Sequence, residues 1–168
     1  MSFLYTAENI AAVIIQRTCD LNHPVNNLKL NKMLYLVQLE AIKRGYSEGL
    51  FDSSKYSSGE FSAWRHGPVC PTIYYALCHW IAYPFEKDCK MVKEHWTLLD
   101  KDAESVVNKV IEETLLYNPW DLVVLLHKSK VWKRYYGYNY VSYLTNYMPW
   151  EKILSDDLDW SLELKNLF

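Results

Sequence analysis

The chain has 168 residues, a length typical of one folded domain, and its 18 basic and 20 acidic side chains nearly cancel. Hydrophobic residues make up 50% and charged residues 23% of the sequence, which excludes disorder as the overall description. The formal net charge of −2 argues against a nucleic-acid binder that works by bulk electrostatics. Seven Trp, 14 Tyr and 5 Phe are typical of hydrogen-bonded core aromatics or of a protein-binding surface.

Compartment signals favour a cytoplasmic protein. The longest apolar runs are far shorter than the roughly 18 to 20 residues that a membrane helix needs, and the N-terminus lacks the features of a secretory signal. The four cysteines have none of the close spacings that structural zinc prefers, and no glycine-rich phosphate loop is present. We therefore expect no membrane contact, no metal site and no cofactor.

Helical periodicity predicts two helices in the first 45 residues. The first starts after Thr6, a candidate N-cap, and ends near Pro24, which cannot continue a helix. The second starts after Asn26 or Asn27 and stops at Gly45. Its apolar stripe is Leu30, Met33, Leu34, Val37 and Ala41, and Lys29, Lys32 and Lys43 fall outside that stripe.

The helical period disappears between residues 48 and 71. Within this segment Glu60–Arg65 alternates well enough for a short strand, and Gly67-Pro68 closes it as a turn. Pro71 suits the first position of a third helix, which Pro84 stops. The helical spacing there involves Ile73, Ala76, Leu77, Trp80 and Ile81.

The second half of the chain adds two more predicted helices. His95–Leu99 is a candidate for a second short strand within the ambiguous stretch 90–99. Asp100 opens a helix, and Asn118-Pro119 caps and starts another that runs through Leu126. The buried stripe expected for the first of these is Val106, Val107, Val110, Ile111, Thr114 and Leu115. The fold class predicted is mainly α: a single compact domain, 1–168, with about five or more helices and a small β element near residues 59–66.

The sequence contains no recognisable catalytic set, so we predict that the protein is not an enzyme. No serine or cysteine lies in a nucleophile elbow. Cys70 follows His66 closely and would be activated at a helix start, but a small buried hydrophobe is the simpler interpretation. An enzyme that uses His66, His127 and a nearby acid for proton transfer remains the alternative, and it requires these side chains to converge in a cleft.

A basic cluster surrounds Trp132 and consists of Lys128, Lys130, Lys133 and Arg134. A solvated helix end, where cations complement the helix dipole, is the favoured interpretation. The alternative is a DNA-binding face, which requires further cations beside these four.

The most distinctive segment is Phe61–Val69. Trp64 is a large anchor, Gly67 permits a backbone geometry closed to other residues, and Pro68 restricts the turn. Two interpretations stay open: a packed β-turn that pins the helices together, and an exposed aromatic and cationic loop that grips a protein partner.

These residues carry a resemblance to a known family. Asn27–Gln38 resembles the signature helix of the Panacea domain, the SocA-like antitoxin family, and Phe61–Pro71 is similar to that family's Ala-Trp-x-His-Gly-Pro-Val segment, followed by Tyr74. A third family signature is similar to Leu122–His127 with Trp132. The resemblance covers about residues 5–135 and leaves about 136–168 as a Tyr-rich C-terminal extension.

The resemblance implies a mainly helical fold and an antitoxin of a toxin–antitoxin system, of a family found in bacteria, phages and mobile elements. It implies a cognate toxin as partner, neutralised by direct binding or by delivery to a cytoplasmic protease. Exposed aromatics could also support a homodimer. The residues expected to form or support the contact surface are Trp64, Arg65, His66, Pro68, His127, Lys130 and Trp132. The runner-up functions are a DNA-binding regulator of its own operon and, after it, the small enzyme described above.

Overall fold

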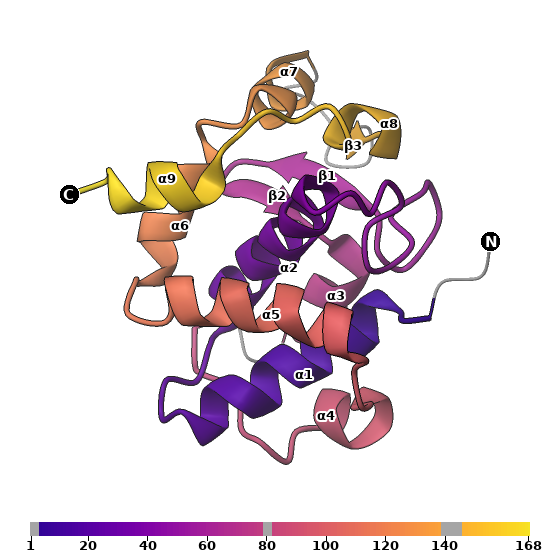
Figure 1. Ribbon diagram of the computed structural model, residues 1–168, viewed down its shortest axis with the longest axis vertical. Helices are drawn as coiled ribbons and strands as arrows, with labels where there is room; N and C mark the ends of the chain where they lie inside the picture. The colour runs from indigo at the N-terminus through magenta and orange to yellow at the C-terminus, as the bar shows by residue number, and fades with distance from the viewer. Residues whose placement is uncertain (1–3, 79–81, 139–145) are drawn as a thin grey trace.

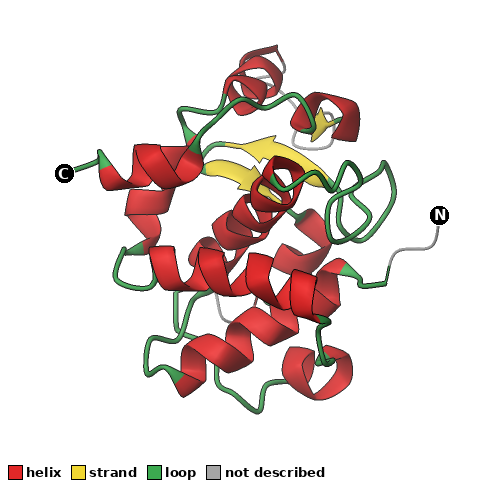
Figure 2. Ribbon diagram, in the orientation of Figure 1, coloured by secondary structure: helices red, strands yellow, loops and turns green. Residues whose placement is uncertain are grey.

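The computed structural model of the protein describes residues 4–78, 82–138 and 146–168 (Figure 1). Over these residues nine helices and three short strands form, so the mainly α prediction is confirmed (Figure 2). The helices are α1 (Ala7–Asp20), α2 (Asn27–Lys43), α3 (Pro71–Ala76), α4 (Lys90–His95), α5 (Lys101–Thr114), α6 (Pro119–Leu126), α7 (Lys130–Tyr138), α8 (Trp150–Ile153) and α9 (Trp160–Lys165). The strands are β1 (Phe61–Trp64), β2 (Gly67–Val69) and β3 (Tyr147–Met148).

Local capping explains where the main helices begin. The Thr6 side chain accepts from Asn9 N at the start of α1, and the Asn26 side chain accepts from Lys29 N at the start of α2. Asp100 and Asn118 cap α5 and α6 in the same way. These four predicted helix starts are therefore confirmed.

The central helix α2 is buried on every side rather than along one stripe. Every residue from Lys29 to Ala41 is buried, since α1, α3, α5, α6 and β2 all contact this helix. Polar side chains inside such an environment need partners. Lys29 Nζ donates to the carbonyls of Thr114 (2.8 Å) and Tyr117 (2.6 Å) beyond the end of α5, and Gln38 Nε2 donates to Phe51 O (2.8 Å). Residues outside the predicted stripe of α2 thus tie it to its neighbours.

The small sheet has the antiparallel order β2–β1–β3. The strand predicted for Glu60–Arg65 is β1, and it forms a hairpin with β2 in which Trp64 pairs with Gly67. The turn predicted at Gly67-Pro68 is wrong, because these residues pair with β1 as part of β2 and the turn is at Arg65 and His66. Gly67 has φ +102°, and a Cβ there would lie 3.2 Å from Lys32 Cε, so both backbone geometry and space call for glycine. The third strand comes from the distant segment Tyr147–Met148.

The second strand suggested for His95–Leu99 is wrong. Helix α4 includes His95, and the residues after it form no strand. Met91 of α4 is buried in the core, and Asn9 Nδ2 of α1 donates to His95 O (2.7 Å), so packing on α1 decides the conformation of this ambiguous stretch. Helix α3 starts at Pro71 as predicted, and Trp80 and Ile81 lie outside the described residues.

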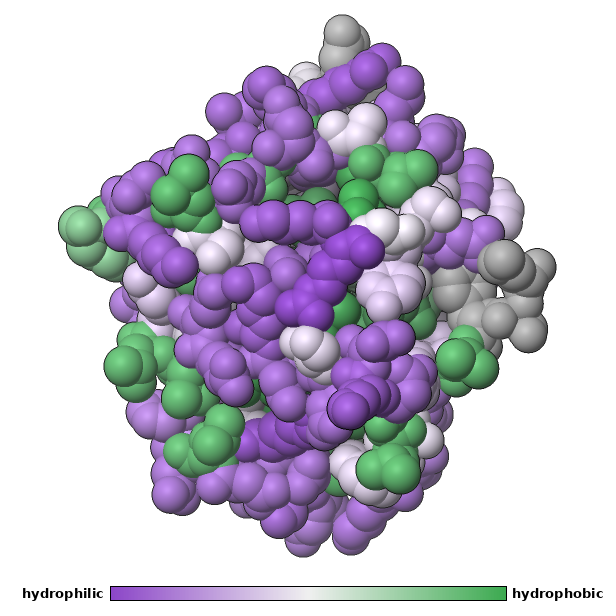
Figure 3. All heavy atoms as spheres, viewed as in Figure 1, coloured by the Kyte–Doolittle hydropathy of each residue, from purple (hydrophilic) through white to green (hydrophobic). Residues whose placement is uncertain are grey.

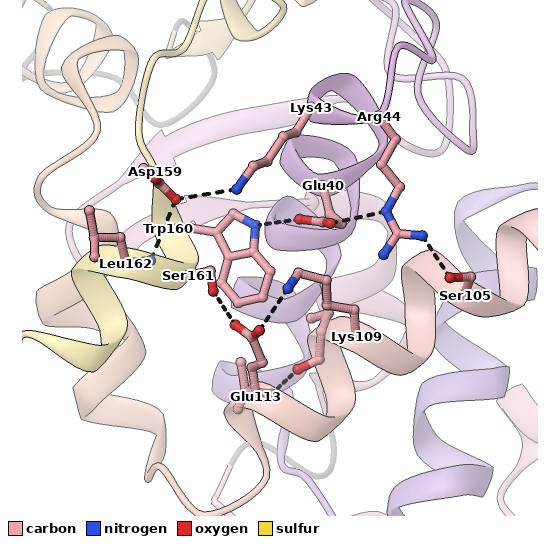
Figure 4. A network of polar contacts seen from close by, with 12 residues as sticks. Glu40, Lys43, Arg44, Ser105, Lys109, Glu113, Asp159, Trp160, Ser161 and Leu162 are labelled. Carbon is pink, nitrogen blue, oxygen red and sulfur yellow. Dashed lines mark hydrogen bonds and ion pairs between the residues drawn. The ribbon is translucent and has the colours of Figure 1, made fainter.

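The C-terminal segment packs on the helical core. Trp160 is 1% exposed, and its Nε1 donates to Glu40 Oε2 of α2 (3.1 Å), while Arg44 Nε donates to the other oxygen of Glu40 (3.0 Å). Figure 4 shows this network continuing through Ser161, which bonds the Glu113 carboxylate of α5. An acidic segment without helical signal in the sequence is therefore anchored by one buried indole.

The face of the molecule seen in Figure 3 is mostly hydrophilic, with apolar side chains in small separate groups. Among residues 4–78, 82–138 and 146–168, no helix is long and apolar enough to cross a membrane.

Candidate functional site

Three side chains from distant parts of the chain hold the backbone of the β1–β2 hairpin. Trp132 Nε1 of α7 donates to Trp64 O (2.8 Å), and Lys32 Nζ of α2 donates to Pro68 O (2.8 Å). His127 Nε2 lies 3.1 Å from Arg65 O, and because a carbonyl only accepts, the proton is on Nε2. The hairpin is thus fixed at three of its carbonyls.

Two of these three side chains, His127 and Trp132, belong to the third signature segment, and their rings also stack. His127 and Trp132 lie with centroids 4.3 Å apart and planes 15° apart, and Trp132 stacks on Tyr136 at 4.9 Å and 12°. Stacking fixes the orientation of the His127 imidazole and of the Trp132 indole, so each nitrogen points at its carbonyl. The packed-turn interpretation of this segment is therefore correct for its backbone.

The side chains of the turn point outward. Arg65 and His66 are exposed, and the His66 ring contacts Trp120 of α6 edge to face at 5.0 Å. Trp64 contacts Tyr75 of α3 at 5.9 Å. We call these five residues, Trp64, Arg65, His66, Tyr75 and Trp120, the hairpin surface. With Trp120 55% and Tyr75 62% exposed, it is an aromatic and cationic patch.

The other candidates occupy different places. Pro68 and Trp132 are buried and His127 is half-buried, so these three support the hairpin from behind. Lys130 is exposed, pairs with Asp157 (3.0 Å) and lines a separate groove of about 200 Å³ between α7 and the segment before α9. The structure therefore groups six of the seven candidates and separates Lys130 from them.

Three basic side chains at the hairpin, Lys32, His66 and His127, have lowered pKa values. Burial lowers the pKa of Lys32 to about 7. Burial first, and then the charges of Arg65 and Lys32, lower the pKa of His66. The pKa of His127 is also lowered, mainly by burial, with further contributions from His66, Lys32 and Lys133. Burial is the largest cause of each shift, and the neighbouring charges that lower the two imidazole pKa values further are cationic.

The two histidines of the enzyme alternative, His66 and His127, both lie at the hairpin. His66 rests on Trp120, and His127 is held by Trp132 and Arg65 O. Within the described parts of the chain, no hydrogen bond or ion pair joins either imidazole to a carboxylate. Cys70 is fully buried, and burial raises the pKa of its thiol to about 12, which confirms it as a small hydrophobe.

The basic cluster is partly neutralised by the C-terminal segment. Lys128 pairs with Glu163 (2.7 Å), as Lys130 does with Asp157. Two of the four cations thus have carboxylate partners, which weakens the case for a DNA-binding face. No group of three or more His, Cys, Asp or Glu side chains that could hold a metal ion occurs in the part of the chain that is described.

Trp120 and Tyr75 were missed as candidates by sequence reasoning. The spacing of Trp120 was a signal, because Trp120 and Val124 lie four residues apart on one face of α6 and are both 55% exposed. The residues that α6 buries are Leu122, Val123, Leu125 and Leu126. Large apolar residues on the outer face of an otherwise buried helix indicate a contact surface. Tyr75 carries no comparable signal.

The three signature segments that converge on the hairpin agree with the family comparison. No curated protein and no solved structure matches the chain. A family model, described as Antitoxin SocA-like, Panacea domain, matches residues 30–133, a span that includes most of α2, the hairpin, α6 and Trp132. Because this match covers well over half of the chain, the protein belongs to the SocA-like antitoxin, or Panacea domain, family.

Proposed function

We propose that this protein neutralises a cognate toxin by direct binding, and that the hairpin surface makes the contact. The observation that carries the proposal is an exposed turn whose backbone is held by side chains from three other elements, α2, the end of α6, and α7. A contact loop fixed before binding loses little conformational entropy on association, which favours tight binding. Membership of an antitoxin family supplies the kind of partner.

The composition of the hairpin surface suits a protein interface. Trp, Tyr and Arg are the residues most enriched where truncation costs the most binding energy, and Trp120, Tyr75 and Arg65 supply one of each. Arg65 and His66 would face an acidic or hydrogen-bond-accepting patch on the toxin. His127, Pro68 and Trp132 act as positioning residues, and we assign Lys130 no contact with the toxin.

The mode proposed is blocking by stoichiometric binding, because one patch is sufficient for it. Delivery of the toxin to a protease would require a second surface for the protease. The two modes differ in toxin abundance: a blocked toxin accumulates in the complex, whereas a delivered toxin disappears. We place the complex in the cytoplasm, where the four free cysteines fit a reducing environment. No catalytic step is part of the proposal.

The test is bacterial growth with the neighbouring reading frame expressed alone and together with this protein. We expect toxicity alone, rescue on co-expression, and co-purification with undiminished toxin levels on an immunoblot. Arg65→Glu should weaken the complex at least about tenfold, since it reverses a charge at the centre of the contact. The matched control is Lys93→Glu, an exposed charge reversal on α4 at the opposite end of the molecule (Figure 1).

Equal rescue by both charge-reversal variants would rule out the hairpin surface as the contact. A harmless neighbour that never co-purifies would remove the antitoxin proposal itself. Light scattering on the protein alone shows whether the same surface first pairs two copies, in which case Arg65→Glu would change the mass in solution.

A further inference from the structure

A pocket of about 500 Å³ lies beside the hairpin surface, between the start of α2, the β1–β2 hairpin, α3 and α6. Its aromatic walls are Trp64, Tyr74 and Trp120, and Leu28 and Val69 add aliphatic surface. This volume is within the range of roughly 300–1,000 Å³ that small-molecule sites occupy. A single aromatic compound would fit within it.

The charge around the pocket has one sign. Lys32, Arg65 and His66 line it, and no carboxylate is among its lining residues. The first turn of the 17-residue helix α2 also borders the pocket and carries no acidic residue, so the positive end of its dipole is uncompensated there. The basic side chains and the helix dipole both favour an anion.

The complete burial of Lys32 is the feature of the pocket that most needs explanation. This side chain is 0% exposed, and Pro68 O is its one hydrogen-bond acceptor among the described residues, although an ammonium has three N–H donors. Its charge is buried without an anionic partner, which is why its pKa falls to about 7. An anion in the pocket would supply the missing charge through space, because Lys32 lines the pocket although its side chain is 0% exposed.

The polar wall of the pocket is held rigidly. Asn27 Nδ2 donates to Tyr74 O (3.0 Å), and Asn31 Nδ2 donates to Asn27 Oδ1 (2.8 Å). Cys70 N in turn donates to Asn31 Oδ1 (2.9 Å). These amides are engaged with each other and with the backbone, so the wall keeps its shape and leaves recognition of a ligand to Arg65, His66 and the aromatic rings.

We propose that this pocket binds a small aromatic carboxylate, with its ring among Trp64, Tyr74 and Trp120 and its carboxylate toward Arg65 and His66. Three aromatic walls select a planar apolar body, and the one-signed charge selects an acid over a neutral analogue. The inference concerns a free ligand and goes beyond toxin binding, because it requires no protein partner.

The experiment is a titration of the isolated protein, by NMR chemical shifts and by calorimetry, with N-acetyl-L-tryptophan and with N-acetyl-L-tryptophanamide. The two probes differ at one group, an ionised carboxylate against an uncharged carboxamide of similar size, and we expect the acid to bind at least about tenfold more tightly, as for a hydrogen bond to a charged group. Trp120→Ala and Arg65→Gln should each weaken binding of the acid. Trp96→Ala is the matched control, because Trp96 is 46% exposed and follows α4, outside the pocket.

Three outcomes would overturn the inference. The first is no binding of the acid at 5 mM or below, which is about the weakest affinity that one buried ring supports. The others are equal binding of acid and amide, and the same loss of affinity for the acid in Trp96→Ala as in Trp120→Ala. A third probe is the peptide Gly-Gly-Gly-Trp with a free C-terminus. Tighter binding of this peptide than of the acid would identify the C-terminus of a protein as the natural ligand and refute a free small molecule. Thermal melts exclude unfolded variants. Growth rescue is not part of these readouts, so the pocket and the antitoxin proposal can fail separately.

Discussion

Trp160 anchors the C-terminal segment, and its replacement by alanine is expected to destabilise the whole protein. Its side chain is 1% exposed between α2 and α5, and its Nε1 donates to Glu40, which is itself 3% exposed (Figure 4). Truncating a buried Trp to Ala costs about 3–5 kcal/mol. The lost donor to a buried carboxylate adds about 1 kcal/mol, kept small because Arg44 still pairs with Glu40.

The assay is urea unfolding followed by circular dichroism at 222 nm, which does not depend on the removed indole. For an m-value of about 2 kcal/mol/M, a loss of about 4–6 kcal/mol lowers the unfolding midpoint by about 2–3 M. The matched control is Leu162→Ala on the same helix, where the side chain is 54% exposed and the expected change is below about 0.5 kcal/mol. A change below about 1 kcal/mol for Trp160→Ala, or one equal to the control, would refute the anchor.

Two further changes probe the supports of the hairpin. Burial lowers the pKa of Lys32 to about 7 in the folded protein, against about 10.4 in the unfolded chain. Between these two pH values the unfolded chain binds more protons than the folded protein does. This lysine therefore makes the free energy of unfolding rise with pH, by up to about 1.4 kcal/mol per pH unit. Urea midpoints at pH 7 and pH 9 should therefore rise less in Lys32→Met than in the wild type; an identical rise would contradict burial of the charge. Trp132→Phe keeps the ring stack but removes the indole N–H that donates to Trp64 O, so it should cost about 1 kcal/mol and shift the backbone amide NMR signals of Arg65 and His66. Unchanged stability and unchanged signals would show that the indole N–H does not hold the turn.

The candidate site was predictable in part, because its first strand is encoded locally. Alternation predicts strand β1, but the turn lies at Arg65 and His66, two residues before the predicted Gly67-Pro68, which belongs to β2. Which aromatic residues stand beside that turn could not be predicted. Trp120 and Trp132 are both close to the hairpin, yet the first is 55% exposed and the second 7% exposed, and the packing of α6 and α7 decides this difference.

The sequence by itself determined the starts of α1, α2, α5 and α6, because a cap such as Thr6, Asn26 or Asn118 bonds a backbone N–H three residues away and needs no distant partner. Only the tertiary structure decided the burial of Lys32, whose carbonyl partner lies 36 residues away, and the pairing of β3 with β1. Contacts between residues far apart in the sequence depend on how all the helices pack together, and periodicity within one helix carries no record of that packing.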